Sequence, residues 1–333
     1  MGRPTIDDVA RIAGVSIATV SRCLRQPEVV AEPTRLRVLA AVRDTGYAPS
    51  TTAQSLRARR SHAVLVLVPD VGNTFFSEIL RGIQGVAAEA GITMLIGDTG
   101  RERAREAAYA RDLRNGRADG ALLLAAPELA WDDLPHAGPG PAPVVRVSEA
   151  LPGSPGLSVS IDNAAASEAA VAHLLGLGHR RVAHLAGPER NLLTEARREG
   201  WRRAHRAAGL PLDPRLEIAG DFGLASGRRA FATLAALDPR PTAVACANDE
   251  GAMGLIAAAH EAGLVTPRDL SVAGFDDIHF AQAFIPALTT VRQPRAEMGE
   301  AAMRLLLAVW AGEAPASVVL PFALVVRAST AAP

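Results

Sequence analysis

The sequence contains no lysine, so all 35 of its basic residues are arginine. A GC-rich coding sequence, which also favours alanine, accounts for this bias, and we draw no function from it. Cysteine is nearly absent as well: Cys23 and Cys246 lie far apart in the chain, and neither has a second ligand at metal spacing. This scarcity argues against a disulfide framework and against a zinc site, and it fits a reducing compartment.

Long apolar runs are also missing, and none approaches the ~18 residues of a membrane span. The N-terminus reads MGRPTIDDVARIAG and carries acids where a signal peptide needs an apolar core. We therefore expect a cytoplasmic protein with no membrane partner.

Common enzyme motifs are absent too. The chain has neither G-x-x-x-x-G-K-[ST] nor G-x-S-x-G, and its eight histidines are scattered without metal spacing. A Ser/His/Asp grouping could still form in space. The sequence nevertheless predicts that the protein is not an enzyme, and it predicts no cofactor and no metal.

Charge is distributed unevenly along the chain. The 333 residues suggest two or three domains, and the formal net charge is zero. Residues 1–60 hold ten Arg against five acids, whereas the rest of the chain holds 25 Arg against 30 acids. A basic end on a neutral chain indicates a polyanion partner, although a solvated charged face would give the same pattern.

The segment TIDDVARIAGVSIATVSRCL has the pattern of two short helices. Thr5, with Asp8 three residues later, resembles a helix start, and Gly14 ends the first apolar face. Ser16 can cap a second helix. Two short helices joined by a turn of three to four residues that contains Gly predict a helix-turn-helix, in which the second helix reads DNA.

A third helix is expected from about Glu32 to Thr45, with Gly46 as its stop. Three short helices can close a small core. The apolar positions expected to face that core are Leu36, Leu39, Ala40 and Val42.

The outward positions of the second helix are Ile17, Ala18, Ser21 and Arg22. Arg22 could pair with two atoms of a guanine edge, whereas Ile17 and Ala18 offer apolar contact, for instance to a thymine methyl. Hydroxyl groups in the same region suit phosphate oxygens, although each could equally be a helix cap or a solvated group. They belong to Thr5, Ser16, Thr19, Ser21, Thr34 and the phenol of Tyr47.

Residues 51–60 read TTAQSLRARR and contain no Gly or Pro, which argues against a simple tether. Thr51 and Gln54 have capping-box spacing, and Ala53 and Leu56 fall on one helical face. One or two turns are below the roughly 12 to 15 residues that an isolated helix needs in water. The segment is therefore expected to be helical only when something binds it.

The remainder of the chain alternates apolar runs, such as AVLVLVP, ITMLIGD and TAVACAND, with amphipathic stretches. This alternation predicts parallel βαβ units in two doubly wound lobes of similar size. Ligands in such sheets lie beyond the carboxyl ends of the strands, so residues that end strands are the candidates for binding.

Those strand-end residues combine carboxylates, an amide, an arginine and aromatic rings. They are Asp70, Phe75, Phe76, Asp98, Asp162, Arg197, Phe222, Asn248, Asp249 and Asp276. Together they describe a site for a hydroxyl-rich ring, as in a sugar or a nucleoside. Other interpretations remain open: Asp276 could begin a helix, Phe75 and Phe76 could be core, and Arg197 lies in the crowded stretch ARREGWRRA.

The stretches TIDDVARIAGVSIATVSRCL, TRLRVLAAVRDTGYAPS and AQSLR resemble the DNA-binding headpiece and hinge of the lactose-repressor (LacI/GalR) family. The resemblance implies that Ile17, Ala18 and Arg22 read the major groove. It also implies that residues 51–58 form a hinge helix in the minor groove, with Leu56 wedged between base pairs. Ala31 stands where the family usually has a Ser cap for the third helix, and Ser50 replaces a usual Asn, so the resemblance does not carry over the two phosphate contacts at these positions.

The remainder of the chain resembles the periplasmic-binding-protein-like effector domain of the same family, through VPDVGNTFFSEILRGI, LGHRRVAHLAGP, PTAVACANDEGAMG and DLSVAGFDD. The resemblance implies that Arg197, Asn248 and Asp276 hold ligand hydroxyls and that Phe76 and Phe222 flank the ring. The stretches FFSEILRGI, LIGD, HLAGPE and GDF are most similar to the cytidine-repressor branch, which responds to a nucleoside.

These patterns predict a headpiece at residues 1–49, a hinge at 50–60 and an effector-binding and dimerisation domain at 61–333. Its lobes are expected at about 61–161 with 292–320, and at 162–291 with 321–333. The predicted function is a homodimeric repressor that binds operator DNA under control of a small molecule, a nucleoside or a sugar. The alternatives are a solute-binding protein, which has no use for a helix-turn-helix, and an enzyme on the same fold.

Overall fold

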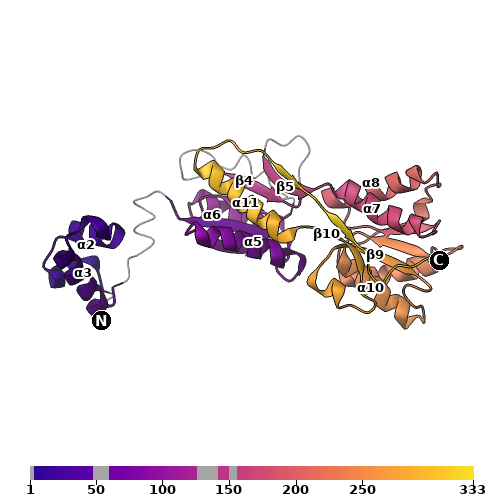
Figure 1. Ribbon diagram of the computed structural model, residues 1–333, viewed down its shortest axis with the longest axis horizontal. Coiled ribbons are helices and arrows are strands. Elements are labelled where there is room, and N and C mark those ends of the chain that lie inside the picture. The colour runs from indigo at the N-terminus through magenta and orange to yellow at the C-terminus, as the bar shows by residue number, and fades with distance from the viewer. Residues whose placement is uncertain (1–3, 48–59, 126–141, 150–155) are drawn as a thin grey trace. The chain divides into compact units, whose positions relative to one another are not determined.

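A computed structural model of the chain describes residues 4–47, 60–125, 142–149 and 156–333. The chain divides into two compact units, Met1–Ser61 and His62–Pro333, and each is described by itself (Figure 1). Among the described residues, no helix is long and apolar enough to cross a membrane. The predicted hinge helix, with Ala53 and Leu56, lies outside the described residues and stays a prediction.

The described residues of the first unit, 4–47 and 60–61, form three helices and one short 3-10 turn. They are α1 (Ile6–Ala13), α2 (Ile17–Arg25), η1 (Pro27–Val29) and α3 (Glu32–Thr45). Thr5 and Asp8 form a reciprocal capping box at the start of α1, and the Ser16 side chain caps α2. Gly14 and Gly46, each with a φ of 65°, end α1 and α3 in the left-handed region that favours glycine. The predicted helix starts and stops are therefore confirmed.

The predicted core face of α3 was partly wrong. Leu36 and Leu39 are 58% and 40% exposed, and Ala40 is only half-buried. The residues that pack against the other helices are Val38, Ala41 and Val42. Apolar residues occur on all sides of this helix, so their spacing alone fits more than one face, and packing against α1 and α2 selects one of them.

The second unit is built on two six-stranded sheets. Sheet 1 has the strand order β11-β5-β4-β3-β1-β2, and all of its neighbouring strands run parallel. Its strands are β1 (Ala63–Val68), β2 (Thr93–Asp98), β3 (Ala121–Leu123), β4 (Val144–Val147), β5 (Leu157–Ile161) and β11 (Val318–Leu320). The described helices of this lobe are α5 (Phe75–Glu89), α6 (Arg103–Arg114) and α11 (Arg295–Trp310).

Sheet 2 has the order β12-β10-β9-β8-β6-β7, parallel except for β12 against β10. Its strands are β6 (Val182–Leu185), β7 (Glu217–Ile218), β8 (Ala243–Cys246), β9 (Ser271–Asp276), β10 (Thr289–Arg292) and β12 (Ala323–Val325). Its helices are α7 (Asn163–Gly176), α8 (Leu192–Ala207), η3 (Pro214–Leu216), α9 (Leu224–Ala235), α10 (Asp249–Glu261) and η4 (His279–Gln282).

The chain passes between the two sheets three times: from β5 to α7, from β10 to α11, and from β11 to β12 (Figure 1). A small apolar cluster fills this region, with Ile161, Phe275 and Val291 buried in it. Two parallel-sheet lobes and a helical headpiece confirm the predicted fold class. Strand β10 of sheet 2 ends at Arg292, which is the first residue of the segment 292–320 predicted for the first lobe.

Glycines let the helices of the first lobe approach closely. A Cβ on Gly82 of α5 would lie 2.1 Å from the Ala296 carbonyl oxygen, and one on Gly299 of α11 would lie 2.1 Å from the Ile79 carbonyl oxygen. These contacts leave no room for a methyl group on either helix. Helices α5 and α11 therefore form a rigid pair on one face of sheet 1.

We expect Gly82→Ala to lower the free energy of unfolding by about 1–3 kcal/mol, because the added methyl group must push α11 away from α5. Gly85→Ala, in the same helix, is the matched control. No atom lies within 4 Å of its new Cβ, so it should be neutral or stabilise by about 0.5–1 kcal/mol. Denaturant unfolding of both variants checks this; equal stability of the two would contradict the close helix contact.

Candidate functional site

The exposed face of α2 carries the predicted reading residues. Ile17, Ala18 and Arg22 are exposed, while Val20 and Cys23 on the opposite side are buried in the headpiece core. A helix held by one face in a small core can present the other face to the major groove. The geometry thus supports α2 as a reading helix.

Four of the six hydroxyl groups predicted to bind phosphates, those of Thr5, Ser16, Thr19 and Ser21, make local hydrogen bonds in this unit. Thr5 Oγ1 donates to Asp8 Oδ2 at 2.8 Å, and Ser16 Oγ accepts from the Thr19 backbone N–H at 3.2 Å. Ser21 Oγ accepts from Arg25 at 3.1 Å. The half-buried Tyr47 packs against the headpiece core, and Thr34 is half-buried in α3. Their phosphate contacts stay predictions.

The second unit contains a cavity of about 190 Å³ between the ends of strands from both sheets. Six of the seven predicted effector residues line it, and they come from both lobes: Phe75, Phe76, Arg197, Phe222, Asn248 and Asp276. Asp70 lines it as well. The strand-end rule for parallel sheets therefore located this cavity from the sequence.

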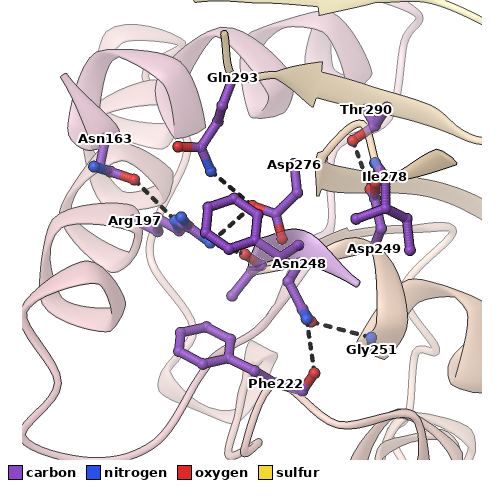
Figure 2. Close-up of polar contacts among 12 residues, drawn as sticks. Asn163, Arg197, Phe222, Asn248, Asp249, Gly251, Asp276, Ile278, Thr290 and Gln293 are labelled. Carbon is purple, nitrogen blue, oxygen red and sulfur yellow. Dashed lines mark hydrogen bonds and ion pairs between the residues drawn. The ribbon is translucent and has the colours of Figure 1, made fainter. Parts of the chain in front are cut away.

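Arg197 lines the cavity and is only 3% exposed, and Figure 2 shows its polar contacts. Its Nε donates to Asn163 Oδ1 at 3.1 Å, and its Nη1 donates to the carbonyl oxygen of Ala247. The guanidinium carbon lies 3.8 Å from the centre of the Phe275 ring. Burial lowers the pKa of Arg197, and the neighbouring carboxylates, Asp276 first, oppose that change. The side chain is thus a fixed, charged donor facing the cavity.

Asp276 forms an ion pair with this guanidinium, with 3.8 Å between Arg197 Nη1 and Asp276 Oδ1. It also accepts from Gln293 Nε2 at 2.7 Å. Burial raises the pKa of Asp276 to about 6, because it outweighs the attraction of Arg197 and Arg295. At neutral pH Asp276 is therefore an ionised acceptor, suited to ligand hydroxyl groups.

Asp249 lies behind this pair rather than in the cavity wall. Its carboxylate accepts from Thr290 Oγ1 at 2.6 Å and from the Ile278 backbone N–H at 2.8 Å. Burial, followed by the charge of Asp276, raises the pKa of Asp249 well above its ordinary value. Asp249 therefore joins the start of α10 to β10 and to the segment that follows β9, and it does not line the cavity.

Strained backbone positions surround the cavity. Phe222, Asp276 and Ser148 have φ angles of 67°, 119° and 75°, although none is glycine. Such residues cost about 1–3 kcal/mol each and persist only where their surroundings fix them. For Phe222 the fixing contact is Asn248 Nδ2, which donates to its carbonyl oxygen at 2.7 Å.

Gly187 supports the same aromatic ring. A Cβ at Gly187 would lie 2.2 Å from ring atoms of Phe222, so only glycine leaves room for the ring in its present position. The orientation of Phe222 is therefore set from both its backbone and its ring.

Asp162 is the predicted effector residue that the structure does not bring to the cavity. Its carboxylate accepts from the Ala165 backbone N–H at 2.9 Å, and it caps α7 as an exposed residue. Asp98 likewise accepts from the backbone N–H groups of Val71 and Gly100. Asp98 ends β2 and Asp162 follows β5, but backbone N–H groups occupy their carboxylate oxygens.

Several lining residues were missed by the sequence analysis: Asn73, Ser148, Glu149, Asn191, Asp221 and Glu250. Asn191 Nδ2 donates to Glu149 Oε1 at 3.2 Å, which connects the two lobes across the cavity. The strand-end rule applied to β4, which ends at Val147, would have identified Ser148 and Glu149. Asn191 precedes α8 as its cap and carries no comparable signal.

Among the described residues, no group of three or more His, Cys, Asp or Glu side chains could hold a metal ion.

Two family models match the chain. One is described as bacterial regulatory proteins, lacI family, and covers residues 5–50; the other is a periplasmic binding protein-like domain and covers residues 171–330.

Characterised repressors match nearly the whole chain. The HTH-type transcriptional repressor CytR of Escherichia coli (strain K12) is 39% identical over 330 residues, which are 98% of this chain and 96% of that protein. The HTH-type transcriptional repressor PurR of Photobacterium profundum is 35% identical over 305 residues, 91% of each chain.

Solved structures agree with these matches. The lac repressor dimer bound to operator and the anti-inducer ONPF has a TM-score of 0.88 at 29% identity and covers 99% of this chain and 100% of its own. The transcriptional regulator CelR in complex with cellobiose has a TM-score of 0.72 at 33% identity and covers 98% and 100%.

The raised pKa of Asp276 predicts a pH-dependent stability difference from Asp276→Asn. A carboxyl group whose pKa is higher in the folded state stabilises the fold below its unfolded pKa of 3.8, and this contribution is lost as pH rises towards about 6. The free energy of unfolding of the wild type should therefore fall relative to Asp276→Asn between pH 4 and 7, by roughly 2–3 kcal/mol. Denaturant unfolding at several pH values measures this. A difference that does not change with pH would show that burial does not shift this carboxyl group.

Proposed function

Because the chain belongs to the lacI family of bacterial regulatory proteins, we propose that it is a homodimeric transcriptional repressor whose operator affinity is set by a nucleoside. Its relatives are transcriptional repressors, and the prediction that it is not an enzyme is confirmed. One observation carries the proposal: an exposed reading helix and a polar, aromatic cavity between two lobes occur in the same chain.

The headpiece supports specific DNA binding. Arg22 projects from the exposed face of α2 and can donate two hydrogen bonds to guanine, the commonest specific contact in the major groove. Ile17 and Ala18 beside it can contact only apolar groups of the base edges. The partner is therefore a double-stranded operator with at least one guanine in each half-site.

A homodimer is supported by the edge of sheet 1. Strand β2 ends that sheet, and its Leu95 and Ile96 are 38% and 47% exposed although they lie on opposite faces of the strand. An exposed apolar edge strand in a folded protein invites pairing with another chain. The similar lac repressor structure is a dimer bound to its operator.

The cavity supports a nucleoside as effector. Phe76 and Phe222 offer aromatic faces for a flat ring, while Arg197 and Asp276 offer a donor and an ionised acceptor for ribose hydroxyls. A sugar is the alternative, because the similar regulator CelR binds cellobiose. A ligand that contacts both lobes acts through its different affinities for two arrangements of those lobes.

The DNA prediction concerns Arg22. Full-length protein should bind a duplex with two inverted half-sites as a dimer, and Arg22→Ala should weaken operator binding by about 1–3 kcal/mol and relax specificity at one base pair. Arg43→Ala, an exposed arginine in the last turn of α3, is the control and should leave base preference unchanged. Titrations against operator and against duplexes with single substitutions measure both effects. Equal affinity of the wild type for every sequence would refute the proposed reading helix.

The effector prediction uses thermal melting of the full chain with cytidine, adenosine, uridine, ribose and common hexoses. A ligand at a hundredfold excess over its Kd stabilises the fold by about 2.7 kcal/mol, so a nucleoside should raise the melting temperature measurably. Asp276→Ala should abolish that shift, whereas Asp112→Ala, on the surface of α6, should retain it. A shift in melting temperature with a hexose and with no nucleoside would contradict the nucleoside as effector, while the assignment as a repressor would stand.

A further inference from the structure

Arg295 occupies the point where the chain enters the first lobe for the second time. It is the first residue of α11, three residues after β10 of sheet 2 ends at Arg292, and its side chain is 8% exposed. Because glycine contacts lock α11 against α5, Arg295 is fixed relative to the start of α5. A buried guanidinium at this crossing requires hydrogen-bond acceptors, and the positions of those acceptors in the two lobes indicate the role of Arg295.

Three backbone carbonyl groups accept from Arg295. Its Nη1 donates to Phe75 O at 3.2 Å and to Thr74 O at 3.4 Å, and both belong to the first lobe. Its Nη2 donates to Asp277 O at 2.9 Å, in the second lobe. One planar side chain therefore joins the beginning of α5 to the segment that follows β9.

Both ends of this bridge adjoin the effector cavity. Phe75 lines the cavity itself, and Asp277 directly follows Asp276, which also lines it. Asp277 has a φ of 52°, so the chain turns sharply at this point. The bridge is thus one residue away from the proposed ligand acceptor.

The second-lobe end of the bridge is held firmly. The buried carboxylate of Asp277 pairs with Arg292 Nε at 2.6 Å and with Arg327 Nη2 at 2.7 Å. These arginines lie at the end of β10 and two residues after β12, so Asp277 is tied to both strands. Its carbonyl group is therefore a fixed point of the second lobe.

The first-lobe end is held from two sides. The backbone N–H of Thr74 donates to the carboxylate of Glu250, a cavity-lining residue at the start of α10 in the second lobe. The carbonyl group of the same residue accepts from Arg295. The peptide groups that begin α5 therefore have polar partners from the second lobe as well as from α11.

We propose that Arg295 is a positioning residue for the effector cavity: its guanidinium fixes the start of α5, with Phe75 and Phe76, relative to Asp276 on the other lobe. This inference rests on the proposed binding of an effector between the lobes. A lysine cannot replace it, because a single ammonium group cannot reach acceptors on both sides as the planar fork of arginine does. Without the bridge, the distance between the rings of Phe75 and Phe76 and the carboxylate of Asp276 would no longer be fixed.

The test compares Arg295→Lys and Arg295→Met with Arg304→Met, all in the full chain. Arg304 lies on the same helix, is 63% exposed and pairs with Glu300 at 2.9 Å, so its loss controls for removing a charge from α11. Amide hydrogen exchange of residues 74–80, without ligand, is the first measurement. Both Arg295 variants should exchange at least about tenfold faster there, while the strands of sheets 1 and 2 keep their protection.

Nucleoside affinity is the second measurement. Both Arg295 variants should bind the nucleoside at least about tenfold more weakly than Arg304→Met does, because part of the binding free energy must then order the cavity. A purely structural role would instead raise exchange throughout the second unit and lower the melting temperature in proportion to the loss of affinity.

If Arg295→Lys binds the nucleoside as tightly as the wild type and its amides 74–80 exchange at the wild-type rate, the proposal is overturned, because a positive charge alone would then suffice. If Arg295→Met does not fold, Arg295→Lys decides the question by itself. If no nucleoside binds the wild-type chain, the proposed effector is wrong, and the exchange comparison without ligand still tests Arg295.

Discussion

The second unit, His62–Pro333, depends on the interactions of one buried group, the guanidinium of Arg197. A guanidinium group that is only 3% exposed is tolerated only if other groups of the protein accept its hydrogen bonds and balance its charge. Asn163 from α7, the carbonyl group after β8 and the Phe275 ring of β9 meet those needs, and Asp276 supplies the opposing charge. Three elements of the second lobe, α7, β8 and β9, are thereby fixed around one side chain of α8.

The same arrangement explains how a cavity suited to sugar-like hydroxyls can form in an apolar chain. The central strands of both sheets are buried and carry valine, leucine and alanine, and polar groups are concentrated where the strands end. Asp276 ends such a strand, and Asn248 follows another at the start of α10. Side chains from both lobes meet there, so a ligand in this cavity would contact both lobes. Three crossings of the chain connect these lobes. This position would couple the proposed ligand binding to the arrangement of the lobes.

Much of this could be predicted from the sequence because the signals are local. Thr5, Asp8 and Gly14 act on backbone groups a few residues away, and the strand-end rule found Asn248 and Asp276 from the alternation of elements. Arg197 lies inside α8 instead of at a strand end, so that rule does not account for it. The sequence analysis failed where long-range packing decides. Leu36 and Leu39 are as apolar as the residues that α3 buries, and only packing against α1 and α2 selects the inner face. Asp162 caps a helix instead of facing the cavity, and the bridge by Arg295 depends on carbonyl groups more than two hundred positions away.

The central claim is that a small molecule between the lobes controls operator binding, and one titration of the full chain tests it most directly. Operator affinity should be measured without and with a saturating nucleoside, and nucleoside affinity without and with operator. The account predicts that the nucleoside changes operator affinity by about 5- to 150-fold, in either direction, and that operator changes nucleoside affinity by the same factor. Operator affinity that stays the same while the cavity is occupied would contradict it.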